Sequence, residues 1–136
     1  MTDCIFCKII AKEVPSFTIY EDSATRAFLD VFPSTDGHVV VVHMRHEEKI
    51  TGYTADELAS LFKTVQKIAK ALEKTYNTTT LSIGINHGEP KGVRHTHIHV
   101  IPRFAGDGGG IMQTLPMIKP KEELSKVLKN IKANLT

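Results

Sequence analysis

Four consecutive valines, Val39–Val42, constrain the fold of this chain more than any other segment. Valine branches at Cβ and favours an extended backbone, and a run without polar alternation is typical of a strand buried on both faces. The chain must therefore supply further strands beside this one and cover both faces of the sheet. β-Branched or alternating segments predict strands at residues 17–21, 25–30, 38–43, 81–85 and 96–101.

A long helix is predicted between the third and fourth of these strands. Thr54 and Glu57 have the spacing of a capping box, and apolar residues follow at helical intervals at Leu58, Leu61, Val65, Ile68 and Leu72. A short helix is expected at 5–12, and a C-terminal helix is expected to begin at Pro120. Hairpin-linked strands with separate helices predict an α+β fold with a mainly antiparallel sheet.

The length of 136 residues predicts a single domain over 1–136, with a core at about 4–110 and a helical tail at about 119–134. With 41% hydrophobic and 24% charged residues, the composition is that of a folded protein and not of a disordered one. A net charge of +2 gives no reason to expect nucleic acid or a membrane as a partner. Since no apolar run is long enough for a membrane helix or a signal peptide, a cytoplasmic protein is expected.

Three of the seven histidines, His95, His97 and His99, alternate along the last predicted strand and therefore point to one face of the sheet. The outer two lie about 13 Å apart along a straight strand, which is too far for all three rings to bind one metal ion. Three interpretations remain open. The row is the polar face of an exposed strand, two of its members share a catalytic metal, or His95 binds a metal while the others perform chemistry on phosphorus.

The only two cysteines, Cys4 and Cys7, form a Cys-x-x-Cys motif close to the start of the chain. A structural disulfide is not expected in a reducing compartment, and a thioredoxin-like motif would follow a strand in a βαβ unit. The motif is best interpreted as half of a zinc site whose other ligands come from elsewhere in the chain.

The segment His95–Ile101 resembles the signature of the histidine triad superfamily, in which histidines alternate with apolar residues. Further segments resemble the same family in the same order, and the pattern is similar to its Hint-like branch in the form with an N-terminal Cys-x-x-Cys. These segments are Ile5–Ile10, Ile19–Asp22, Ala27–Asp30, Gly37–Val41, Asn86–Gly88 and Val100–Arg103.

The resemblance implies a nucleotide hydrolase or transferase that cleaves at the α-phosphate of a purine nucleotide, with an AMP or GMP moiety. A nucleoside phosphoramidate or an adenylylated conjugate would be the substrate, and a nucleoside monophosphate would be released. His97 would be the nucleophile that forms a nucleotidyl-histidine intermediate, with His99 and His38 around the phosphate. Asp30 would bind the ribose and Asn86 the phosphate, and the base pocket would be formed by Phe6, Ile9, Phe28 and Leu29.

The resemblance also supplies the second half of the metal site. Cys4, Cys7, His46 and His95 would hold a structural zinc ion, and no metal would be required for the chemical step. Members of the family form homodimers by joining their sheets, and a homodimer is expected for this chain. His43 and His87 match no functional position and are expected at the surface.

The chain departs from the family pattern directly before the triad. The segment Glu89–Arg94 is shorter than its counterpart and lacks the usual Ser or Thr, and the chain has no tryptophan at its C-terminal end. Lys91 and Arg94 would offer charge where the hydroxyl is missing. A dinucleoside polyphosphate hydrolase is therefore retained as an alternative, together with a nucleotide-binding protein whose catalysis is vestigial.

Overall fold

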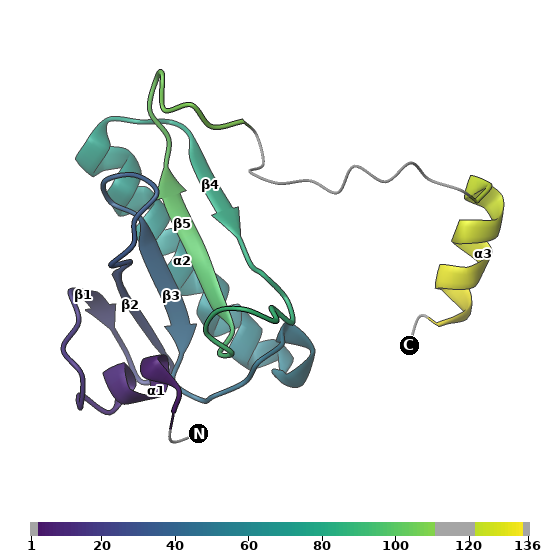
Figure 1. Ribbon diagram of the computed structural model, residues 1–136, viewed down its shortest axis with the longest axis horizontal. Helices are drawn as coiled ribbons and strands as arrows, with labels where there is room; N and C mark the ends of the chain where they lie inside the picture. The colour runs from purple at the N-terminus through teal and green to yellow at the C-terminus, as the bar shows by residue number, and fades with distance from the viewer. Residues whose placement is uncertain (1–2, 111–121, 135–136) are drawn as a thin grey trace.

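The computed structural model describes residues 3–110 and 122–134 of the chain. Five antiparallel strands form one sheet in the order β1-β2-β3-β5-β4, with the long helix α2 against one face (Figure 1). The predicted α+β fold is therefore confirmed.

The valine run lies at the centre of the sheet, as its sequence predicts. It forms β3 (Val39–His43), which pairs with β2 (Thr25–Leu29) on one side and β5 (His97–Pro102) on the other. The sheet is completed by two edge strands, β1 (Thr18–Glu21) and β4 (Leu81–Gly84). All residues of β3 are buried, because helices cover both faces of the sheet at this strand.

Helix α2 (Ala55–Tyr76) covers one face of the sheet, and the predicted capping box begins it. The Thr54 side chain accepts a hydrogen bond from the Glu57 amide, and the Glu57 carboxylate accepts one from the Thr54 amide. Asn77 ends the helix in the left-handed conformation. The apolar face of α2 packs on alternate residues of the central strands, which are Ala27, Val39, Val41, Ile98 and Val100.

The opposite face of the sheet carries the short helix α1 (Ile5–Ile10). Ile9 packs there against Phe28, Val40 and Val42, which alternate with the residues facing α2. Arg26 is 7% exposed and donates to the Ile9 carbonyl at 2.6 Å, so it satisfies a backbone acceptor near the end of the helix. The even-numbered residues of β3, Val40 and Val42, lie on this face. Their partners in β5, His99 and His97, therefore lie on it as well.

Helix α3 (Leu124–Ala133) lies within the predicted C-terminal tail. Its predicted first residue, Pro120, falls outside the described residues. Among the helices that the structure describes, none is both long and apolar enough to cross a membrane.

Candidate active site and metal site

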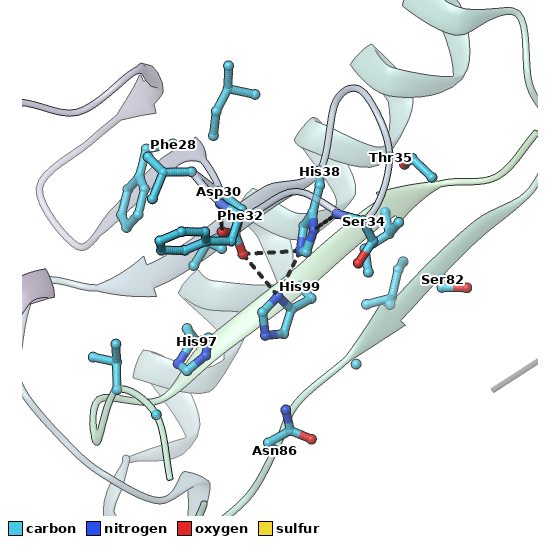
Figure 2. A pocket seen from close by; sticks show the side chains of 18 of the residues that line it. Phe28, Asp30, Phe32, Ser34, Thr35, His38, Ser82, Asn86, His97 and His99 are labelled. Carbon is cyan, nitrogen blue, oxygen red and sulfur yellow. Dashed lines mark hydrogen bonds and ion pairs between the residues drawn. The ribbon is translucent and has the colours of Figure 1, made fainter. Parts of the chain in front are cut away.

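An open cleft of about 1250 Å³ lies over the sheet face that carries α1 (Figure 2). Every residue that the sequence predicts for catalysis or nucleotide binding lines this cleft. These residues are His38, His97, His99, Asp30, Asn86, Phe6, Ile9, Phe28 and Leu29.

Strand register explains why three histidines from two segments meet in the cleft. His97 pairs with Val42 and His99 pairs with Val40, so the two rings emerge beside β3 on the same face. His38 immediately precedes β3 and, by alternation, shares the face of Val40. Figure 2 shows the three rings next to one another, with His99 between His38 and His97.

The hydrogen bond of His97 fixes which of its ring nitrogens is free. Its Nδ1 lies 2.7 Å from the His95 carbonyl oxygen, and the ring is 8% exposed. A carbonyl can only accept, so Nδ1 carries the proton and Nε2 keeps its lone pair. The His97 and His99 ring centroids are 4.9 Å apart. This arrangement leaves one imidazole nitrogen of His97 able to act as a nucleophile toward a group in the cleft.

Asp30 lies beside the other two histidines. Its Oδ1 accepts from the Phe32 amide at 2.8 Å, and its Oδ2 lies 3.5 Å from His38 Nε2 and 3.9 Å from His99 Nδ1. Burial lowers the pKa of His99 to about 4, with the neighbouring histidines acting in the same direction and Asp30 opposing. Burial also lowers the pKa of His38, against the attraction of Asp30. Both rings are therefore neutral at pH 7.

These shifted pKa values predict that acid destabilises the fold. As the pH falls from about 6.5 toward about 4, the unfolded chain takes up protons that folded His99 and His38 refuse, so the free energy of unfolding decreases. The melting temperature, followed by circular dichroism across this range, measures the effect. The substitution His99→Asn removes one titrating ring and should make the dependence on pH shallower. An unchanged slope in that variant would contradict the assignment.

One end of the cleft is apolar. Phe6 stacks edge-on against Phe28, with ring centroids 5.4 Å apart, and against His97 at 5.1 Å. Phe32 also lines the cleft, and its side chain is 88% exposed. An exposed aromatic ring at the rim of a cleft is a surface on which a planar ligand can stack. Phe32 could not be predicted as a cleft residue from the sequence, because a single Phe in a loop carries no signal that separates it from a core residue.

The polar end of the cleft contains Asn86, which follows β4 and lies across the cleft from the histidines in Figure 2. The segment after it includes Arg94, whose guanidinium donates to Glu48 at 2.7 Å. Arg94 lines a smaller hollow of about 320 Å³ beside the cleft, and not the cleft itself. Its charge is therefore already paired, which weakens the expectation that it replaces the missing hydroxyl.

The four predicted metal ligands come together beside the first turn of α1. The ligand atoms of Cys4, Cys7, His46 and His95 all lie within 4.8 Å of one another. The Nδ1 atom of His95 is 3.6 Å from both sulfur atoms, and that of His46 is 3.3 Å from Cys7 Sγ. A tetrahedral zinc ion with its usual bond lengths would place sulfur and nitrogen about 3.6 Å apart. The donor set and its spacing therefore fit zinc.

The proton positions of this cluster agree with metal binding. His95 Nε2 lies 3.0 Å from the His43 carbonyl oxygen and must donate to it, which leaves the lone pair of Nδ1 directed at the cysteines. Burial raises the pKa of the Cys7 thiol to about 11, so a metal must displace that proton.

The prediction that His43 lies at the surface is wrong. His43 is 7% exposed, because it has the parity of Val39 and Val41 and therefore lies on the sheet face that packs against α2. Its ring centroid lies 5.3 Å from that of Tyr53, with the two rings tilted to each other. His87 is exposed, as expected.

This chain is similar in sequence or structure to several known proteins, among them the following three. An adenosine 5'-monophosphoramidase of Saccharomyces cerevisiae is 33% identical over 97% of this chain and 82% of its own length. The crystal structure of a HIT family protein from Bacillus subtilis superposes with a TM-score of 0.84 at 34% identity, covering 98% of each chain. A zinc-bound histidine triad family protein from Mycobacterium smegmatis superposes with a TM-score of 0.74 at 29% identity, covering 98% of this chain and 95% of its own.

The model of the HIT domain matches residues 11–106. That range contains every strand of the sheet, the long helix and all three alternating histidines. The chain therefore belongs to the HIT domain family.

Proposed function

We propose that this protein is a nucleotide hydrolase that cleaves at the α-phosphate of a purine nucleotide and releases the nucleoside monophosphate. The preferred substrate would be a nucleoside phosphoramidate or an adenylylated conjugate, in keeping with the yeast relative that is named a monophosphoramidase. The observation that carries the proposal is the free Nε2 of His97, fixed by the bond from Nδ1 to the His95 carbonyl, within a cleft that has an apolar and a polar end.

The proposed reaction has two steps. His97 Nε2 attacks the α-phosphorus and forms a P–N bond, while the bond to the leaving amine breaks and the amine takes a proton from water. Water then attacks the same phosphorus and gives its proton to the hydroxide left by the first step, the bond to His97 breaks and the monophosphate leaves. His99 and His38 would hold the phosphoryl oxygens and Asn86 would contact them from the other side of the cleft.

The rest of the cleft would bind the nucleoside. Asp30 has a carboxylate oxygen facing the cleft beside His38, where it would accept hydrogen bonds from the ribose hydroxyls. The base would enter the apolar end, which is formed by Phe6, Ile9, Phe28 and Leu29.

We also propose that Cys4, Cys7, His46 and His95 hold a zinc ion. Four protein ligands leave no open coordination position, so the ion would act as a cross-link and not as a catalyst. It would join the start of α1 to His46, which follows β3, and to His95, which precedes β5. The homodimer remains a prediction.

The proposal is tested by measuring AMP release from adenosine 5'-phosphoramidate and from a diadenosine polyphosphate at equal concentrations. We expect kcat/KM to be at least about tenfold higher for the phosphoramidate, because the arginines that line the cleft and the hollow beside it, Arg103 and Arg94, are already paired with Asp107 and Glu48. A preference for the polyphosphate would favour the alternative hydrolase. AMP binding without turnover of either substrate would favour a protein with vestigial catalysis.

A further inference from the structure

The backbone amide of Ser34, a residue that itself lines the cleft, begins a chain of hydrogen bonds that runs through His38 to His99. Ser34 N–H donates to His38 Nδ1 at 3.0 Å. An amide N–H cannot accept, so Nδ1 of His38 must be the unprotonated nitrogen and its ring proton must lie on Nε2. The tautomer of His38 is thus set by the main chain and not by another side chain.

The hydrogen bond from His38 to His99 also determines the tautomer of His99. His38 Nε2 lies 2.8 Å from His99 Nδ1, and because Nε2 carries the proton it donates and His99 Nδ1 accepts (Figure 2). The proton of His99 must therefore lie on Nε2. His99 lines the cleft next to His97, whose own Nε2 is unprotonated. The two neighbouring rings thus have opposite tautomers, one with a lone pair on Nε2 and one with a proton there.

We propose that the Ser34 amide is a positioning group that fixes the tautomers of His38 and His99, so that His99 offers an N–H donor to the phosphoryl group. The inference rests on the proposed function for its catalytic meaning, although the tautomers can be measured without it. A donor held in place before the reaction stabilises negative charge on the phosphoryl oxygens without the cost of reorienting. The opposite tautomer of His99 would present a lone pair and repel those oxygens.

The loop that carries Ser34 is held in place directly after that residue. Thr35 Oγ1 donates to the Pro102 carbonyl at 2.8 Å, which attaches the loop to the end of β5. Gly37 has a φ of +81°, and a Cβ at this position would clash with the Tyr76 ring. The amide is therefore presented from a fixed loop to a ring at the start of a buried strand.

We call the hydrogen bonds from the Ser34 amide to His38 and from His38 to His99 the relay. The charged groups around it do not change the protonation that the amide favours. Asp30 is the carboxylate that faces both rings, at 3.5 Å from His38 and 3.9 Å from His99, and it favours their protonation. Burial and His97 oppose it at His99, and burial opposes it at His38. The Ser34 amide acts in the same direction as burial, because a proton on His38 Nδ1 would face another N–H donor.

The same amide argues against a metal ion on Asp30, His38 and His99. Their ligand atoms are close enough together for a small cation. Coordination through His38 Nε2 would move the ring proton to Nδ1, where it would meet the Ser34 N–H at 3.0 Å. The relay and a metal at this position are mutually exclusive.

Nuclear magnetic resonance of the full chain with ¹⁵N-labelled histidine tests the tautomers directly, at neutral pH and without substrate. We expect Nδ1 of His38 and of His99 to show the shifts of unprotonated ring nitrogens and both Nε2 atoms to show those of protonated ones, with His97 reversed. A protonated Nδ1 on His38 would overturn the inference whether or not the protein turns over a nucleotide. The expected tautomers in a protein without turnover would leave the relay intact and reject the proposed function.

The substitution Ser34→Pro removes the amide proton, and Ser34→Ala keeps it as a matched control. For Ser34→Pro we expect kcat to fall about tenfold with little change in KM, and the acidic limb of the rate profile to move up by about one pH unit. Ser34→Ala should retain both. Equal pH profiles in the two folded variants would overturn the inference, and if Ser34→Pro does not fold, the measurement on the unaltered chain decides.

Discussion

Replacing His97 with alanine is expected to reduce AMP release from an adenosine phosphoramidate by about four orders of magnitude or more. The substitution removes the imidazole whose Nε2 would form the bond to phosphorus. The unprotonated ring nitrogens of the other two histidines described in the cleft, Nδ1 of His38 and Nδ1 of His99, each already accept a hydrogen bond. Initial rates measured with excess substrate check the expectation. The fold of the variant is verified by circular dichroism.

Two controls separate the loss of chemistry from the loss of binding. His97→Ala should still bind AMP, because the apolar end of the cleft and Asp30 remain. His87→Ala, which changes an exposed histidine on the segment after β4, should keep the activity of the unaltered protein. After an alkaline quench, labelled nucleotide should be attached to the unaltered protein and absent from His97→Ala. Undiminished turnover by His97→Ala would end the proposed mechanism.

Removing the proposed zinc ion is expected to lower the melting temperature by about 10 °C or more, since structural zinc sites contribute several kcal/mol to folding and about 3 kcal/mol suffices for such a shift. The four ligands come from α1, the segment after β3 and the approach to β5, so the ion would hold together parts of the chain that are far apart in sequence. Thermal unfolding with and without a chelator measures the effect. The same chelator saturated with zinc is the control.

Cys4→Ser tests the same site without a chelator. The variant should melt at the temperature of the chelated protein and should not respond to further chelation. Turnover measured soon after chelation, at a temperature where the fold persists, should remain well above background. A rate that falls to background while the fold is intact would assign the ion to catalysis, and an unchanged melting temperature would reject the structural role.

The sequence predicted the framework of this molecule because local rules determine it. The valine run became the central strand, and Thr54 and Glu57 formed the capping box that begins α2. The alternation of His97 and His99 placed them on one face, as period-two geometry requires. The convergence of His46 and His95 with the cysteines depended on the family resemblance, because no local pattern relates residues so distant in the chain.

Other features were out of reach of the sequence for physical reasons. His43 was expected at the surface. It is the last residue of β3, and the alternation of side chains along the strand places it on the face that packs against α2, where it is buried. The Ser34 amide exists in every residue except proline, so its role depends entirely on the path of a loop. The tautomers of His38, His97 and His99 likewise follow from partners that only the folded chain brings within bonding distance.

His95 connects the two halves of the molecule's chemistry. Its imidazole faces the cysteines, and its carbonyl oxygen accepts the Nδ1 proton of His97, the proposed nucleophile. The proposed zinc ion and the proposed nucleotide would thus be linked through a single residue, and thermodynamic reciprocity would apply between their binding. A nucleotide whose binding held His95 in place would raise the affinity for zinc, and zinc would then raise the affinity for the nucleotide by the same factor.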